Sequence, residues 1–266
     1  MMKNKWLLLG GVFLFLLFIA LILSPLERKK TPKIKRPVKV KITSTNISVG
    51  KIAIVIDDWG YSLANPEILK GLNIPLTCAV LPGLKNSAVV AKKLQRLGLE
   101  VILHLPMQPK ETMRLENNTI SITDTQPVIA EIITRALDSV YFAKGVSNHM
   151  GSAVTEDLRT SKIVLEQIKK HKLYFLDSFV TPKSVCAGIA KSLNLRFARR
   201  DIFLDNLNDA EYIHRQLIKL KNIAKIQGQA IGIGHDRKNT LQILKTLLPQ
   251  LKAEGYEFVF VSELAR

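Results

Sequence analysis

Six acidic and imidazole side chains follow apolar stretches that are typical of buried strands. The clearest case is KIAIVIDDWG at residues 51–60, where a β-branched run ends at two adjacent carboxylates, Asp57 and Asp58. Such a run predicts a buried strand of a parallel sheet. Because like charges at close range repel, two buried carboxylates require a cation or a shared proton. The pair indicates a metal ligand beside a catalytic acid or base, or alternatively an Asp that caps the next helix beside a solvated one.

The other four members also lie at the carboxyl ends of expected strands, and they are His104, His149, Asp177 and His235. In α/β barrels these strand ends meet at one mouth, so the six groups are expected to converge there. One carboxylate with two imidazoles suits Zn²⁺ or another divalent transition ion. A metal-activated water, a carboxylate base and an imidazole acid are the parts needed to hydrolyse an amide or an ester. A single His at a strand end is more often structural, so the prediction depends on convergence.

Three further residues near these strand ends each have two interpretations. Asp177 could support the site or cap the next turn of the chain. Trp59 could stack on the face of a sugar or pack in the core. Asp205 belongs to a charged loop at residues 199–205, which could form ion pairs or contact substrate at the rim.

Strand and helix patterns alternate from residue 51 onward. Strands are expected at 52–56, 75–81, 99–105, 145–148, 173–176, 196–198, 230–233 and 258–261. Helices are expected at 65–72, 87–97, 127–142, 155–171, 183–193, 209–227 and 241–253, and a surface excursion at 110–125. Seven or eight mostly parallel strands, each followed by a helix, predict a single irregular (β/α) barrel over residues 51–266.

Six motifs occur in the same order as in a known family. They are IVIDDWG, VILHLPMQP, NHMGS, YFLDS, RDIFLD and IGIGHD. This set resembles the divergent polysaccharide deacetylases, distant relatives of the NodB-homology carbohydrate esterases that de-N-acetylate chitin-like and peptidoglycan sugars. The resemblance covers roughly residue 51 to the carboxyl terminus, and it implies an irregular βα barrel with its site at the carboxyl ends of the strands.

The resemblance also implies a role for each matching residue. Asp57 matches the catalytic base of the family, and Asp58 matches the metal-binding carboxylate. His104 matches the first histidine of the metal motif. His235 matches the late histidine that acts as the general acid.

The chain departs from the better-characterised deacetylases at the second metal histidine. Those enzymes place it four residues after the first, where this chain has Gln108. We expect His149, at the end of the next strand, to supply the ligand instead. Gln108 is then left as a supporting residue.

The amino-terminal part of the chain differs in composition from the rest. Trp6 to Leu23 is almost wholly apolar and uncharged, and it is about long enough to cross a bilayer. Residues 1–24 are therefore expected to form an uncleaved single-pass anchor in the cytoplasmic membrane. Residues 25–50 are rich in Pro, Lys and Thr and are expected to form a flexible basic linker. Basic residues after the anchor favour a cytoplasmic location for the folded domain, but anchors with a short charged lead normally export the domain behind them, so we expect it to be extracytoplasmic or periplasmic.

Composition restricts the partners of the chain. The net charge is +17, and about half of it lies in residues 1–50, which carry ten Lys or Arg and one Glu. The basicity is thus no evidence for nucleic-acid binding by the folded part. The two cysteines, Cys78 and Cys186, lack close metal-binding spacing and are expected to be buried thiols, with a disulfide as the alternative. Nothing in the sequence indicates a protein partner.

These observations lead to one main expectation for function. The chain is expected to be a metal-dependent hydrolase, with Zn²⁺ as the favoured ion, that removes N- or O-acetyl groups from a cell-envelope glycan. The alternative is a membrane-tethered glycan-binding or envelope-assembly protein that has lost turnover. A metal-dependent hydrolase of another ester or amide is a third interpretation.

Overall fold

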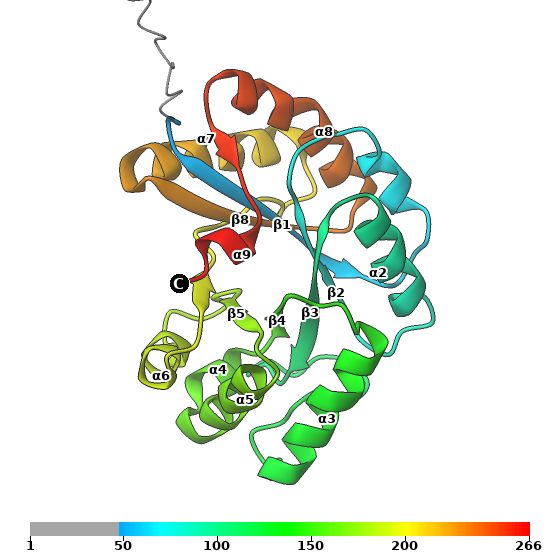
Figure 1. Ribbon diagram of the computed structural model, residues 1–266, viewed down its shortest axis with the longest axis vertical. Coiled ribbons are helices and arrows are strands. Elements are labelled where there is room, and N and C mark those ends of the chain that lie inside the picture. Colours follow the sequence, from blue (N-terminus) through cyan, green and yellow to red (C-terminus); the bar gives the residue numbers. More distant parts are fainter. Residues whose placement is uncertain (1–47) are drawn as a thin grey trace, which may run out of the picture. The chain divides into compact units, whose positions relative to one another are not determined.

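The computed structural model describes residues 48–266 (Figure 1). The expected anchor at 1–24 and nearly all of the expected linker at 25–50 lie outside these residues. Among residues 48–266, no helix combines the length and the apolar character that crossing a bilayer requires.

A nine-stranded parallel sheet forms the centre of the domain. Its strands are β1 (Lys51–Trp59), β2 (Thr77–Val80), β3 (Glu100–Met107), β4 (Gly145–Met150), β5 (Tyr174–Asp177), β6 (Phe197–Arg199), β7 (Ile202–Phe203), β8 (Gln229–His235) and β9 (Glu257–Phe258). The strand order is β6-β5-β4-β3-β2-β1-β8-β7, and β9 pairs with β1. The sheet curls so that β1 and β5 face one another across its hollow side (Figure 1).

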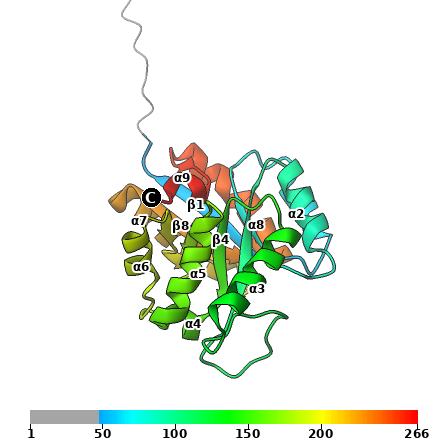
Figure 2. The same ribbon diagram turned by 60° about the horizontal axis from the view of Figure 1, so that its bottom comes forward.

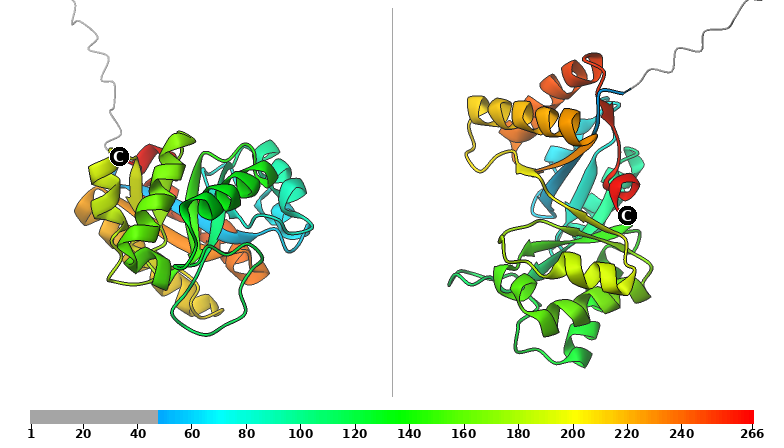
Figure 3. Two further views of the ribbon diagram at one scale, coloured as in Figure 1. Left: turned by 90° about the horizontal axis from the view of Figure 1, so that it is seen from below. Right: turned by 90° about the vertical axis from the view of Figure 1, so that its left-hand side faces the viewer.

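Helices cover the outer face of the curled sheet (Figures 1 and 3). They are the 3₁₀ helix η1 (Asn65–Leu69), α2 (Ser87–Arg96), α3 (Gln126–Ser139), α4 (Ser152–Glu156), α5 (Leu158–Lys170), α6 (Cys186–Leu193), α7 (Ala210–Gln227) and α8 (Lys238–Ala253). A last short helix, α9 (Val261–Leu264), lies instead inside the curl (Figure 1).

The apolar run of β1 is buried on both faces, as its sequence predicts. Ile52, Ile54 and Ile56 pack in the outer core between the sheet and the helices. Ala53 and Val55 point the other way, into an inner core that also contains the side chains of Val259, Val261, Leu264 and Ala265. Alternate residues of one strand thus serve two cores, because successive side chains point to opposite faces of a sheet.

The sheet is a curled half-barrel, which agrees with the expected irregular (β/α) arrangement, and its two end strands do not pair with each other. The path of paired strands ends at β6 and β7, which are consecutive in the chain and do not pair. The chain crosses the opening between them: the N–H of Arg200 donates to Asp177 O of β5, and the N–H of Asp201 donates to Ile231 O of β8, at 3.0 and 2.9 Å. The parallel α/β class is confirmed, whereas barrel closure is not.

Three local expectations are corrected by the structure. Residues 258–261 were expected to form a strand, but β9 ends at Phe258 and α9 begins at Val261. The helix expected at 155–171 is two helices, α4 and α5, and Asp157 caps the second by accepting a hydrogen bond from the N–H of Thr160. Strand β7 lies within the stretch that was expected to be a charged loop.

The two cysteines, Cys78 and Cys186, are buried and free, so the alternative of a disulfide is wrong.

Candidate metal centre

A β-bulge near the end of β1 determines how the two adjacent aspartates are presented. The pairing of β1 with β2 shifts register between Ile56 and Trp59. Asp58 lies in this bulge with φ = 65°, in the left-handed region. Neighbouring residues of a regular strand point to opposite faces, and a bulge changes the direction of a side chain. Both carboxylates therefore approach His104, with Oδ2 of Asp57 at 3.5 Å and Oδ1 of Asp58 at 3.4 Å from its Nε2.

The two histidines come from neighbouring strands. His104 of β3 is opposite Ser147 of β4, and His149 lies two residues farther along β4. Nδ1 of His104 lies 2.8 Å from the hydroxyl of Ser147, which leaves Nε2 for the site. After His149 the chain turns sharply at Met150 and Gly151, both with positive φ. A side chain at Gly151 would meet Cβ of Met107 at 2.9 Å, so this turn requires glycine.

Three side-chain atoms form a compact triangle. Oδ1 of Asp58 lies 3.1 Å from Nδ1 of His149 and 3.4 Å from Nε2 of His104, and the two nitrogens lie 3.3 Å apart. A tetrahedral Zn²⁺ with bonds of about 2.0 to 2.2 Å separates its ligand atoms by about 3.3 to 3.5 Å. Oδ1 of Asp58 is buried and accepts no well-formed hydrogen bond within residues 48–266. The donor set and its spacing therefore fit a divalent transition ion.

The charge state of Asp58 also suits a metal ligand. Burial raises its pKa, but the contacts with His104 and His149 outweigh burial and hold the pKa well below the usual range for an aspartate. The carboxyl group is therefore ionised at neutral pH, as metal binding requires.

Asp57 lies beside the triangle in a different environment. It is almost fully buried, and its Oδ1 has no hydrogen-bond partner within the described part of the chain. Burial raises its pKa, although the nearby His104 and His235 act in the opposite direction. An aspartate with a raised pKa is a better proton acceptor than a solvated one, so Asp57 can serve as a general base.

His235 is held by a buried carboxylate on the far side of the site. Its Nδ1 lies 2.7 Å from Oδ1 of Asp205, and its backbone N–H donates to Oδ2 at 2.9 Å. The hydroxyl of Thr240 also donates to Oδ2 of Asp205, at 2.7 Å. Burial lowers the pKa of His235, but the hydrogen bond and charge of Asp205 outweigh burial and raise it. Because His235 is opposite Asp57 in the pairing of β8 with β1, an imidazole with a raised pKa lies next to the candidate base.

The three supporting residues named from the sequence are held by contacts within the domain. Asp177 accepts hydrogen bonds from the N–H of Phe179 and the hydroxyl of Ser184, at 2.7 and 2.6 Å, as expected for the turn-capping alternative. Trp59 is 0% exposed, as expected for packing. Asp205 orients His235 and does not simply pair with arginines.

Gln108 is occupied by the excursion that comes after β3. Its Oε1 accepts hydrogen bonds from the hydroxyl of Ser121 and the N–H of Ile122, at 2.7 and 3.1 Å. Figure 2 shows this excursion as a long loop that projects from the rest of the domain. Gln108 thus fixes the base of the loop, while His149 stands beside His104.

Ser147 contacts a candidate metal ligand and was not predicted from the sequence, whereas Arg200 belongs to the stretch that was expected to be a charged loop. Ser147 is fully buried, and no local pattern separates it from the other polar residues of its strand. Arg200 donates to the carbonyl oxygens of Ser178 and Phe179, at 2.6 and 2.7 Å, and its guanidinium lies over the ring of Phe203. Burial lowers the pKa of Arg200 to about 10. No local pattern separates this arginine from its exposed neighbour.

Comparison with known proteins agrees with the motifs and the fold. The sequence profile of the divergent polysaccharide deacetylases matches residues 54–265. The chain belongs to this family. The profile begins within β1 and ends within the inner-core segment at the carboxyl terminus, so membership covers almost the whole described domain.

The curated relatives that this deacetylase-family chain matches are longer than the matched region. The uncharacterized protein YibQ of Escherichia coli is 32% identical over 208 residues, which are 78% of this chain and 65% of that protein. An uncharacterized protein of Haemophilus influenzae is 32% identical over 224 residues, 84% of this chain and 80% of that protein. The chain thus spans just under two thirds of the Escherichia coli relative.

A solved structure shares the curled half-barrel of the family domain. It is the crystal structure of the uncharacterized protein ATU2773 from Agrobacterium tumefaciens, with a TM-score of 0.76 and 24% identity. The superposition covers 81% of this chain and 89% of that one. At this identity the likeness establishes the fold alone.

Proposed function

We propose that this protein is a metal-dependent hydrolase that removes acetyl groups from a cell-envelope polysaccharide. The observation that carries the proposal is the triangle of Asp58, His104 and His149, whose spacing fits a tetrahedral divalent ion. Membership of the divergent polysaccharide deacetylases supports the substrate class.

The proposed chemistry divides between two acid–base groups on either side of the metal ligands. A divalent ion held by these ligands would supply polarisation of the acetyl carbonyl and activation of water. Asp57 takes the proton from the attacking water, since its raised pKa favours proton uptake. His235, whose pKa is raised by Asp205, gives a proton to the departing amine or alcohol. The ligands Asp58, His104 and His149 hold the ion between them.

We further propose that the domain works outside the cytoplasm, with an envelope glycan as its partner. The sequence of residues 1–24 supports a membrane anchor, and zinc is the ion that the Asp/His/His donor set favours.

The direct test measures acetate released from acetylated glycan fragments by the purified full-length chain, with and without a chelator. We expect release that the chelator abolishes and that Zn²⁺ restores. Asp57→Asn and His235→Gln should each lower the rate by at least about 100-fold. Asp138→Asn is the matched control, because it makes the same change from carboxylate to carboxamide at an exposed position on α3. It should leave the rate unchanged.

The alternative function predicts a different outcome of the same experiment. A glycan-binding protein without turnover would bind the fragments, release no acetate with any metal, and keep its affinity after Asp57→Asn. The substitution of Gln108 for the usual second histidine is the sequence feature that keeps this alternative open.

A further inference from the structure

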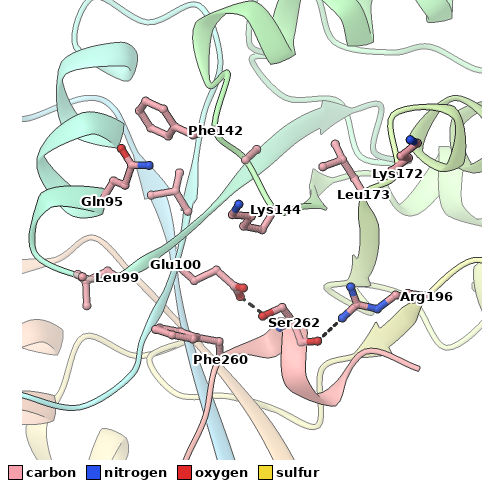
Figure 4. Close-up of a pocket in the computed structure, with 13 residues that line it drawn as sticks. Gln95, Leu99, Glu100, Phe142, Lys144, Lys172, Leu173, Arg196, Phe260 and Ser262 are labelled. Atoms are coloured by element: carbon pink, nitrogen blue, oxygen red, sulfur yellow. Dashed lines mark hydrogen bonds between the residues drawn. The ribbon is translucent and has the colours of Figure 1, made fainter.

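A cavity of about 670 Å³ lies at the opposite end of the sheet from the candidate metal centre (Figure 4). Most of the residues that line it begin strands or precede them, whereas the metal ligands lie near strand ends. Its wall comes from the start of β3, the loops before β4 and β5, the start of β6 and the segment that leads into α9. The volume is in the range of small-molecule sites.

Glu100 is the most informative residue of this wall. It is 8% exposed, so its side chain is more than nine-tenths buried. Its Oε1 accepts three hydrogen bonds, from the hydroxyls of Thr77 and Tyr174, both at 2.9 Å, and from the N–H of Ser262 at 3.2 Å. These bonds explain why the residue is polar and hold the carboxyl-terminal segment against the sheet.

The second oxygen of Glu100 has no such explanation. Within residues 48–266, no hydrogen bond reaches its Oε2, and no lysine or arginine nitrogen lies within the 4.0 Å of an ion pair. Figure 4 shows the carboxyl group among the side chains that line the cavity, next to Ser262. Oε2 is not one of the fully buried polar atoms that lack a partner in the described residues, so it reaches the solvent of the cavity while the rest of the side chain is buried. The cavity therefore presents an acceptor that suits a cationic donor.

Two lysine ammonium groups on the same wall suit a negatively charged group of a ligand. Lys144 and Lys172 line the cavity, and neither side chain makes an ion pair or hydrogen bond within the described residues. Arg196 differs, because its guanidinium donates to the carbonyl oxygens of Ser262 and Ala265. Phe142 and Leu173 add apolar surface to the lining (Figure 4).

We propose that this cavity binds a zwitterion, namely an amino acid or a short peptide with free termini. The ligand's ammonium group pairs with Oε2 of Glu100, its carboxylate pairs with Lys144 and Lys172, and its apolar part lies against Phe142. A simple cation would be repelled by the two lysines, and a simple anion would leave Glu100 unmatched. The proposal is independent of the deacetylase reaction, since it uses none of the groups of the metal centre.

The test compares three probes that differ in one charge each, by calorimetry with the purified full-length chain. The probes are the dipeptide alanyl-leucine, its des-amino analogue propionyl-leucine, and its carboxamide alanyl-leucinamide. We expect the dipeptide to bind with a Kd of about 1 mM or tighter, and each analogue to bind at least about tenfold more weakly.

Two variants test which side chain of the protein recognises each charged group of the ligand. Glu100→Gln keeps a carbonyl oxygen that can accept the three hydrogen bonds now made to Oε1. The fold should therefore survive, and a thermal melt checks this. It should weaken the dipeptide at least about tenfold and leave propionyl-leucine unchanged. Lys144→Gln should weaken the dipeptide and leave alanyl-leucinamide unchanged. Glu131→Gln, an exposed change on α3, is the matched control and should alter nothing.

Either of two results overturns the proposal. One is the absence of dipeptide binding at concentrations up to about ten times the expected Kd. The other is binding that Glu100→Gln does not weaken, since the ammonium would then be recognised elsewhere.

Discussion

The hydrogen bond between Ser147 and His104 gives the sharpest test of the proposed metal centre. The hydroxyl of Ser147 lies 2.8 Å from Nδ1 of His104, and both residues are buried. When Nδ1 donates to this hydroxyl, the lone pair of the ring is on Nε2, the atom that belongs to the ligand triangle. Ser147→Ala removes the partner that orients the ring without removing a ligand.

The expected loss of metal affinity follows from the place of this hydrogen bond, which orients a candidate metal ligand. Removing a hydrogen-bond partner of a metal-binding histidine typically lowers metal affinity by about 10- to 100-fold. At about 1.4 kcal/mol for each factor of ten, this corresponds to about 1.4 to 2.8 kcal/mol. The same substitution should lower the free energy of unfolding of the metal-free protein by about 1 kcal/mol, the usual net value of one hydrogen bond.

The assay is a competition titration of Zn²⁺ between the metal-free protein and a chelating dye. Ser161→Ala is the matched control, because Ser161 is also a buried serine, and its hydroxyl donates to Val154 O at 2.7 Å, outside the ligand triangle. We expect the control to bind Zn²⁺ like the parent. Equal affinities of Ser147→Ala and the parent, or no Zn²⁺ binding by the parent, would refute the assignment of His104 as an oriented ligand.

Other contacts in the domain give three further predictions. His149→Ala should lower the metal bound per chain, by elemental analysis, and unchanged metal content would exclude His149 as a ligand. Asp205→Asn should lower the pKa of His235, because the hydrogen bond and charge that raise it are weakened. If protonated His235 is the acid, activity is lost as pH rises through its pKa, so the alkaline limb of the pH–rate profile should move to lower pH. An unmoved limb would assign it to another group. Gly145→Ala would place Cβ 2.5 Å from the ring of Tyr174, and denaturant titration should show a loss of about 1 to 3 kcal/mol in the free energy of unfolding. Unchanged stability would show that the ring can move away.

Most of the strands were predictable because their signal is local. The buried run of β1, for example, is continuous in the sequence, and it needs no knowledge of its neighbours to be recognised. The end of such a run also shows where a polar group will reach the rim. This is why Asp58, His104 and His149 could be named as a group before any contact between them was known.

The errors arose where neighbouring strands decide the outcome. Residues 259–261 are all apolar, which is compatible with a buried strand and with a buried helix. Periodicity cannot separate the two over so short a stretch. They leave the sheet because the hollow side of the curl must be filled, which Val259 and Val261 do. The half-barrel shape depends on neighbouring strands in the same way, since neither β6 nor β7 carries a local signal that shows whether the two strands pair.

The sequence by itself determined the parallel α/β class, the family and the residue types available for chemistry. Only the tertiary structure decided which oxygens and nitrogens face one another. The bulge at Asp58 brings two consecutive carboxylates to one histidine, and the pairing of β1 with β8 sets His235 beside Asp57. Both depend on the register between strands that are distant in the chain. Register is set by packing across the whole sheet, so no stretch of sequence carries it alone.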